Sequence, residues 1–90
     1  SLRGLVIPMD IRRPFTDLDQ QMMDWTDELQ LPVHILLTKA DKLSRGKAMG
    51  VLQSVRSKWL KDYDATIQLF SAPKRVGIDE ARTQIQSWLL

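Results

Sequence analysis

The sequence contains no cysteine and only one histidine among its 90 residues. The absence of cysteine excludes a disulfide scaffold, a zinc ribbon, an iron–sulfur site and a cysteine nucleophile. With His34 as the single imidazole, a zinc hydrolase site would lack most of the ligands that it usually has. No apolar run approaches the ~20 residues of a membrane span, and no charged-then-apolar signal segment opens the chain. We therefore expect a cytoplasmic protein.

A large excess of charge of either sign is also missing. Thirteen basic and eleven acidic residues give a net charge of +2, far from the dense basic surface typical of a nucleic-acid-binding protein. Hydrophobic residues make up 43% of the chain and charged residues 27%, which are ordinary values for a folded domain. The length allows one small domain, and a chain this short buries only about 60–65% of its unfolded surface.

Three apolar segments have the character of buried strands. They cover residues 4–9, 33–37 and 65–70, and each is followed by a polar residue. The first two are nearly continuous apolar runs, which is typical of parallel strands that are covered on both faces. Pro8 has no N–H to donate to a sheet ladder, so it indicates a strand end, a bulge or an unpaired side at that position.

Helical spacing of apolar residues follows each predicted strand. The apolar positions are Leu18, Met22, Trp25 and Leu29 in the first stretch, Ala48, Leu52, Val55 and Trp59 in the second, and Ile78, Ala81, Ile85 and Trp88 in the third. Thr16 and Ser44 are candidate N-caps of the first two helices. No helix is apolar all round, so we expect each to lay one apolar stripe on something else. The order β-α-β-α-β-α predicts an α/β fold with three parallel strands alternating with three helices.

In a parallel α/β sheet, ligands bind at the carboxyl ends of the strands. The second strand ends in the tetrapeptide Thr38-Lys39-Ala40-Asp41, and the third ends in Phe70-Ser71-Ala72. The tetrapeptide resembles the guanine-recognition motif [NT]KxD of P-loop GTPases. The tripeptide resembles their SA(K) motif, in which a backbone N–H contacts the guanine O6. Both lie where such motifs are expected, directly after a strand.

The chemistry of guanine explains these residue types. Guanine presents N1–H and an exocyclic amino group side by side, and a fixed carboxylate can accept from both. A base without this pair of donors leaves a buried acceptor unpaired, at a cost of about 1–3 kcal/mol. The resemblance makes Asp41 this carboxylate. It implies that the Lys39 stem lies along the base and reaches towards a phosphate loop, and that Thr38 braces the loop.

The rest of the chain is similar to one family in particular, the bacterial EngB (YihA/YsxC) GTPases. The similarity is carried by residues 9–14, 18–22, 36–43, 70–72 and 77–79 and extends over nearly all ninety residues. It implies a GTP- and GDP-binding protein that acts in late assembly of the large ribosomal subunit and in normal division septation, with Mg²⁺ as cofactor in the full-length protein.

The chain departs from that family in lacking a phosphate loop, GxxxxGK[ST], a magnesium-coordinating switch threonine and a DxPG motif. Gly46-Lys47 cannot end a phosphate loop, because Asp41 and Ala48 stand where glycine and serine or threonine are needed. We therefore expect residues 1–90 to be the C-terminal, guanine-recognition half of an EngB-type G domain. Alone it would have no catalytic residue and no magnesium ligand, bind nucleotide weakly and not hydrolyse GTP. The open edge of its first strand invites dimerisation or a swap.

Other interpretations remain beside this one. The chain could be a non-enzymatic α/β module that docks on protein or RNA, with the Thr38–Asp41 tetrapeptide incidental. A flavodoxin-like domain would need a phosphate-binding turn after the first strand, and residues 10–13 contain no glycine. The small net charge gives little support to RNA contacts by Lys74, Arg75 and the lysines of the second helix.

Several other polar and large apolar residues have structural interpretations. We expect an Asp10–Arg12 ion pair at the end of the sheet, and a structural role for His34. We expect the acidic residues of the first helix to be solvated, and the methionines and tryptophans to be packed in the core or half-buried.

Overall fold

A computed structural model describes residues 3–89 of the chain. The strands are β1 (Leu5–Asp10), β2 (Val33–Thr38) and β3 (Ala65–Leu69), and the helices are α1 (Asp17–Glu28), α2 (Arg45–Trp59) and α3 (Ile78–Leu89). Two short 3-10 turns, η1 (Ala40–Lys42) and η2 (Leu60–Asp62), flank α2. Each strand bound lies within one residue of the range predicted from the sequence.

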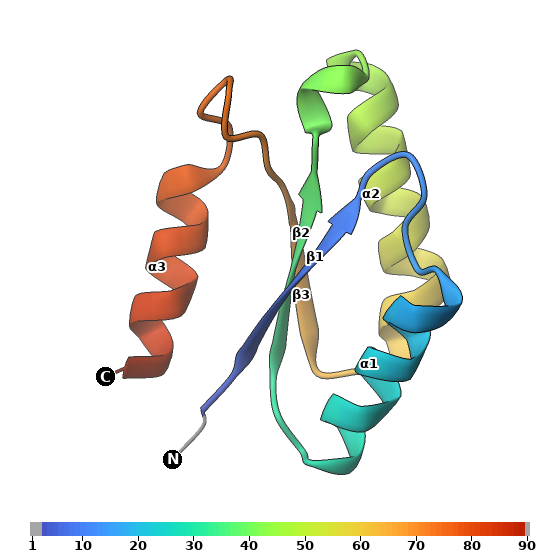
Figure 1. Cartoon of the computed structure of the whole chain (residues 1–90), viewed down its shortest axis with the longest axis vertical. Coiled ribbons are helices and arrows are strands. Elements are labelled where there is room, and N and C mark those ends of the chain that lie inside the picture. The colour runs from blue at the N-terminus through green and yellow to red at the C-terminus, as the bar shows by residue number, and fades with distance from the viewer. Residues whose placement is uncertain (1–2, 90) are drawn as a thin grey trace.

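The three strands form one parallel sheet in the order β1-β2-β3. Leu5 is opposite Val33, which in turn is opposite Ala65, so the strands are in register from their first residues. Helices α1 and α2 cover one face of the sheet and α3 covers the other (Figure 1). The predicted alternation of parallel strands and helices is confirmed.

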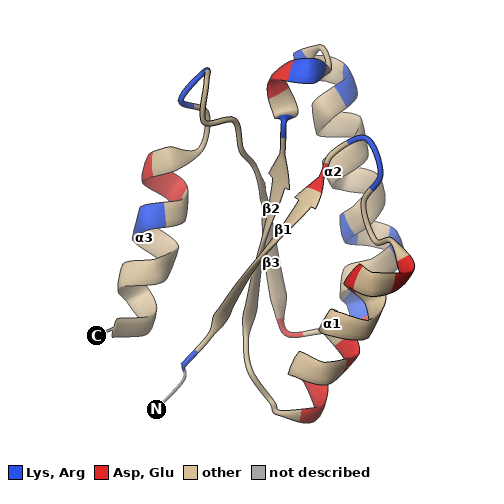
Figure 2. Cartoon of the chain, in the orientation of Figure 1, with Lys and Arg blue, Asp and Glu red and all other residues tan. Residues whose placement is uncertain are grey.

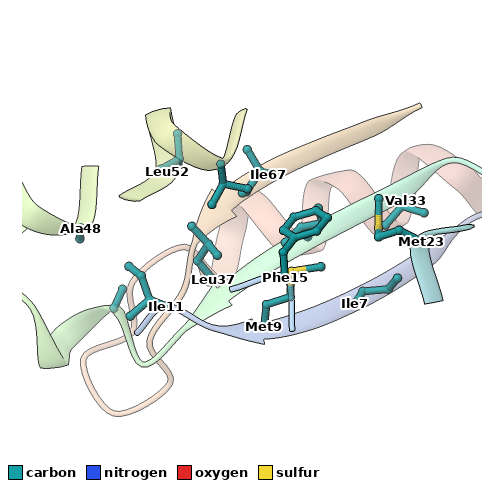
Figure 3. Close-up of a cluster of buried hydrophobic side chains, with 13 residues drawn as sticks. Ile7, Met9, Ile11, Phe15, Met23, Val33, Leu37, Ala48, Leu52 and Ile67 are labelled. Atoms are coloured by element: carbon teal, nitrogen blue, oxygen red, sulfur yellow. The ribbon is translucent and has the colours of Figure 1, made fainter. Parts of the chain in front are cut away.

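The main core lies between the sheet and the helices α1 and α2 (Figure 3). Its central residues include Met23 of α1, Ile35 and Leu37 of β2, and Leu52 of α2, all of them buried. Near one end of α2 the rings of Phe15 and Trp59 stack, with their centroids 4.8 Å apart. The stack fixes the segment that joins β1 to α1 against α2.

Helix α2 packs as its spacing predicted, whereas α1 does not. In α2, Ala48, Leu52 and Val55 are buried and Trp59 is half-buried. In α1 the predicted stripe faces outward: Leu18, Met22, Trp25 and Leu29 are 67, 37, 49 and 50% exposed. The residues that face the sheet are Met23 and Thr26. Spacing defines a stripe on a helix but not the element that covers it, and the expectation that Met22 and Trp25 are packed in the core or half-buried is wrong.

The remaining large side chains give a mixed outcome. Met23 is buried and Trp88 is half-buried, as expected, but Met49 is 40% exposed. In α3, Ala81 is buried, while Ile85 is 41% exposed. The outer part of this stripe is therefore only partly covered within residues 3–89.

Both predicted N-caps are confirmed. The Thr16 hydroxyl accepts from the Asp19 backbone N–H, and the Asp19 carboxylate accepts from the Thr16 N–H, which together form a capping box. Ser44 accepts from the backbone N–H of Lys47 at the start of α2. These caps satisfy N–H groups that the first turn of a helix leaves without partners.

Pro8 lies in β1 on its unpaired side. The backbone N–H groups of Leu5 and Ile11 donate to the Pro32 and Thr38 carbonyls on the β2 side, both at 3.0 Å. Because backbone groups alternate in direction along a strand, those of Val6, Pro8 and Asp10 point away from β2. Proline therefore costs the sheet no hydrogen bond here. Of the three interpretations of this residue, the unpaired side is confirmed.

None of the helices within residues 3–89 has the length and apolar character that a membrane span requires.

Candidate functional site: the carboxyl edge of the sheet

The polar segments predicted to carry function meet at one edge of the sheet. Asp10, the last residue of β1, is opposite Thr38, the last residue of β2. The Phe70 carbonyl accepts from the backbone N–H of Ala40 at 3.1 Å, so the segment after β3 is bonded to the loop after β2. The Thr38 hydroxyl donates to the Met9 carbonyl at 3.2 Å and ties that loop to β1.

The loop after β2 turns sharply at Lys39. This residue has a left-handed backbone conformation, with φ 59° and ψ 33°, which costs a non-glycine residue about 1–2 kcal/mol. The turn directs the chain into η1, in which Ala40 is buried and Asp41 occupies the first turn. Strained backbone of this kind gathers at functional sites, and here it separates the Lys39 and Asp41 side chains.

Asp41 is held by a hydrogen bond from the neighbouring loop. The Ser71 hydroxyl, on a residue that is 1% exposed, donates to Asp41 Oδ1 at 2.7 Å. This bond lowers the pKa of the Asp41 carboxyl below its usual value, and the Lys42 and Lys74 cations act in the same direction. At neutral pH the site thus presents an ionised, oriented carboxylate whose remaining lone pairs can accept from a ligand.

Lys39 points towards Asp10, which is the centre of a small ionic network. Its Nζ lies 3.5 Å from Asp10 Oδ2. Arg12 donates to the same carboxylate from Nε at 3.2 Å and from Nη2 at 3.0 Å, and the Arg12 backbone N–H donates at 2.9 Å. The Arg12 hydrogen bonds hold the pKa of the Asp10 carboxyl well below its usual range. The predicted Asp10–Arg12 ion pair is confirmed.

The contact between Lys39 and Asp10 was not predicted from the sequence. The signal for it lies in the register, because Asp10 opposite Thr38 places its side chain one residue from Lys39. The register of β1 against β2 could not be predicted from the sequence, because the whole of α1 lies between these two strands in the chain. We interpret Asp10 as a group that restrains the Lys39 side chain at the edge of the sheet.

The backbone of residues 70–72 has one N–H available for a ligand. The Phe70 N–H donates to the Leu37 carbonyl at 3.0 Å, and the Ser71 N–H donates to the Val76 carbonyl at 3.0 Å. Within residues 3–89 the Ala72 N–H has no acceptor. Of the three residues predicted to contact a guanine O6 through the backbone, Ala72 is therefore the one whose donor is free.

The turn that contains Ala72 is closed at both ends. Ser71 and Val76 exchange backbone hydrogen bonds of 3.0 and 2.9 Å. Gly77 follows with φ +77°, and a Cβ there would overlap the Leu69 carbonyl and the Gln68 amide. The Gln68 Nε2 donates to the Gly77 carbonyl at 2.7 Å. The turn is thus fastened to the sheet just before α3 begins.

A cavity of about 400 Å³ borders Asp41 on the α2 side. Ala40 and Asp41 line it, together with Leu69, Val76 and the charged side chains of Arg45 and Lys74. The other predicted site residues do not line this cavity, so the seven residues share one edge of the sheet rather than one hollow. Residues 3–89 contain no cluster of His, Cys, Asp or Glu side chains able to hold a metal ion.

Comparison with known proteins supports the fold. No family model matches the sequence. The chain is similar to the crystal structure of translation elongation factor SelB from Methanococcus maripaludis in its apo form, with a TM-score of 0.77 and 20% sequence identity over 96% of this chain. It spans 19% of the length of that protein. The likeness confirms the predicted α/β fold of three parallel strands that alternate with three helices, whereas the assignment to the P-loop GTPases and to the EngB family stays a prediction.

Proposed function

We propose that this chain is the guanine-recognition part of a GTP-binding protein of the EngB type. One observation carries the proposal: the Ser71 hydroxyl orients the Asp41 carboxylate at 2.7 Å, at the sheet edge where the Ala72 N–H is free. The Asp41 carboxylate can accept from N1–H and the N2 amino group of guanine, and the free Ala72 N–H beside it can donate to O6. The fold shared with a translation elongation factor is consistent with this assignment.

Each of the seven residues has a place in this proposal. Asp41 accepts from N1–H and the exocyclic amino group, and Ala72 donates its backbone N–H to O6. Lys39 lies along the base, while Thr38 braces the loop through the Met9 carbonyl. Ala40 and Phe70 join the two loops through their backbone bond, and Ser71 orients Asp41.

The phosphates of the nucleotide would be bound elsewhere in a complete G domain. Positioned phosphates, Mg²⁺ and an oriented water carry GTP hydrolysis, and the ninety residues contain no phosphate-loop motif. We propose that residues 1–90 form the C-terminal half of the domain and that a phosphate-loop half docks beside β1. The open edge of β1 and the exposed stripe of α1 support that placement. By the family resemblance, the whole protein acts in large-subunit assembly and in septation.

The experiment that tests the proposal is a change of base specificity. In a chain that also carries a phosphate loop, Asp41→Asn should weaken GDP binding and favour xanthosine diphosphate, whose exocyclic oxygen prefers a donor. We expect a shift of roughly tenfold or more in the ratio of the two affinities, since a lost buried pairing costs about 1–3 kcal/mol. Calorimetric titration with both nucleotides measures it.

Asp62→Asn is the matched control, because it removes the same charge from η2, which follows the C-terminal end of α2, whereas Asp41 lies before its N-terminal end. It should leave the affinity ratio unchanged. If Asp41→Asn also leaves base preference unchanged, Asp41 does not recognise guanine and the assignment fails.

A second candidate function is favoured by the apolar stripe of α1. Leu18, Trp25 and Leu29 are 67, 49 and 50% exposed. Exposed apolar side chains that lie together in this way are typical of a surface that binds another protein. In that case the chain is a non-enzymatic docking module and the tetrapeptide is incidental. Base-specific nucleotide binding separates the two candidates, because a docking module has no preference for guanine.

A further inference from the structure

The charges of the chain are segregated between two neighbouring helices. Figure 2 shows acidic residues along α1 and basic residues along α2, on the same side of the sheet. Helix α1 has five acidic and no basic residues, namely Asp17, Asp19, Asp24, Asp27 and Glu28. Helix α2 has four basic and no acidic residues, namely Arg45, Lys47, Arg56 and Lys58. The net charge of +2 conceals this separation, so it is a poor guide to what α2 can bind.

A groove runs between α2 and the segment that joins β1 to α1. Its volume is about 650 Å³, and we call it the basic groove. Its charged lining residues are Arg12, Lys47 and Lys58, and no acidic residue lines it. Its apolar lining includes Pro14, Leu43, Val51 and Trp59. An electropositive wall around an apolar floor suits an anionic chain that also has apolar parts.

Two of the cations are available to a partner. Lys47 and Lys58 are eleven residues apart, which is three helical turns, so they lie on one side of α2 about 16 Å apart along its axis. Within residues 3–89 neither forms an ion pair. Arg12 differs, because its guanidinium is bonded to both oxygens of Asp10.

The floor of the basic groove is open at Gly50. A Cβ built at this residue meets no atom within 4 Å, so nothing in the chain requires glycine there. Glycine is also among the poorest residues for a helix interior. The bare backbone at Gly50 leaves the lining of the groove open, so a partner can approach α2 closely at this residue.

We propose that the basic groove binds the phosphate backbone of a single-stranded segment of RNA. Its volume is in the range of sites for small ligands, so it can hold a short stretch of one strand. Trp59 stacks on Phe15, and Lys58 Nζ lies 5.4 Å from its ring centre, so Trp59 is not a free platform for base stacking. Recognition is therefore through phosphates, with little dependence on base sequence. The choice of RNA over DNA rests on the ribosomal part of the proposed function.

The test is fluorescence anisotropy with a short labelled single-stranded RNA at several salt concentrations. Lys47→Ala/Lys58→Ala should weaken binding about tenfold or more at low salt. It should also reduce the slope of log K against log salt by about 1.4, since each phosphate contact contributes about 0.7 in single strands. The matched control is Arg56→Ala/Lys61→Ala, which removes the same charge from residues that line a different cavity, beside β3. This control should change the affinity less than twofold.

Four results would overturn the inference. Equal losses in the two double variants would mean that only the overall charge matters. Absence of RNA binding by the unaltered chain would exclude the site, and tighter binding of polyglutamate than of RNA would assign the groove to an acidic protein partner. Single-stranded DNA of the same sequence is the remaining arm, and tighter binding of DNA would overturn the choice of RNA.

The result of the RNA-binding test can be distinguished from the result of the base-specificity test of the proposed function. Lys47 and Lys58 are outside the seven residues assigned to guanine, so their variants should keep the base preference that Asp41→Asn changes. A chain that binds RNA in the groove without guanine selectivity would refute the nucleotide proposal alone.

Discussion

At the scale of single residues, His34 illustrates how a buried polar side chain is satisfied without a ligand. It is 3% exposed, and its two ring nitrogens lie 2.6 Å from Thr66 Oγ1 and Gln68 Oε1. Gln68 Nε2 donates to the Leu69 and Gly77 carbonyls, so its Oε1 is left to accept from His34 Nε2–H. The Thr66 hydroxyl then donates to Nδ1. The structural role expected from the sequence is confirmed.

This arrangement makes Gln68 more important for stability than Thr66. Gln68→Leu removes the partner of a buried imidazole N–H and one of the two donors to the Gly77 carbonyl, which also accepts from the Ala81 N–H. We therefore expect a loss of about 1–3 kcal/mol in the free energy of unfolding. Urea denaturation followed by circular dichroism measures it. Thr66→Val is the control, because residue 66 is exposed and water can replace the hydroxyl. Equal losses in both variants would contradict the proposed bonding pattern.

The candidate site divides into residues that a motif predicts and contacts that only the fold produces. The spacing of Thr38-Lys39-Ala40-Asp41 and Phe70-Ser71-Ala72 after two strands placed both segments at one edge of the sheet. The free N–H of Ala72 could not be predicted, since it depends on Val76 closing the turn and occupying Ser71. The Lys39–Asp10 contact likewise depends on strand register.

At the scale of elements, Tyr63 joins α1 to the segment before β3. Its hydroxyl donates to Asp24 Oδ1 at 2.6 Å. The bond favours the neutral phenol, and with partial burial and the nearby carboxylates it raises the pKa of Tyr63 to about 12. Because the folded pKa is above the unfolded value of about 10, the contribution to stability is present below pH 10 and is lost as the pH rises through about 12.

Tyr63 is the only tyrosine in the chain, so its ionisation can be followed directly by absorbance. We expect a midpoint near 12 in the folded protein and near 10 in urea. Asp24→Asn should move the folded midpoint towards 10, because the charged acceptor is gone. A folded midpoint that is the same in both proteins would show that Asp24 does not control Tyr63.

Helices α1 and α2 show what periodicity can predict about an element and what it cannot. Both have apolar residues at helical spacing, and the existence of each helix and its N-cap were predicted correctly. In α2 the stripe faces the sheet, while in α1 the sheet side belongs to Met23 and Thr26. Thr26 is tolerated there because its hydroxyl donates to the Met23 carbonyl at 2.8 Å. Because Thr26 is polar, the sequence did not indicate that this side of α1 faces the sheet.

At the scale of the whole molecule, exposed apolar side chains gather beside β1. The α1 stripe lies on one face of the sheet, and Ile85 and Leu89 of α3 are exposed on the other, 41 and 75% respectively. A cavity of about 510 Å³ lined by Val6, Ile85 and Trp88 adjoins the β1 edge on that second face. Such surfaces associate with each other when no partner covers them.

We therefore expect the chain to self-associate at high concentration through α1. Leu18→Gln/Trp25→Gln should lower the apparent mass in light scattering, since it removes the two most prominent side chains within that helix. The unfolding free energy should change little, because both residues are largely exposed. Met23→Ala is the contrasting variant, with an expected loss of about 2–5 kcal/mol from a buried position. Unchanged association of the double variant would place the contact elsewhere.

The proline at the open edge of β1 has a consequence for which strand can be added there. Any incoming strand finds a carbonyl but no N–H at Pro8, so one of its own carbonyls stays unpaired. If the incoming strand is β1 of a second copy, in a symmetric antiparallel pair, the defect occurs on both sides and two bonds are lost. Pairing with a second copy therefore loses two hydrogen bonds at this edge, whereas pairing with a strand that contains no proline loses one. The pyrrolidine ring of Pro8 thus makes it less favourable for two identical chains to join their sheets through β1. The same edge remains open to a strand of another sequence.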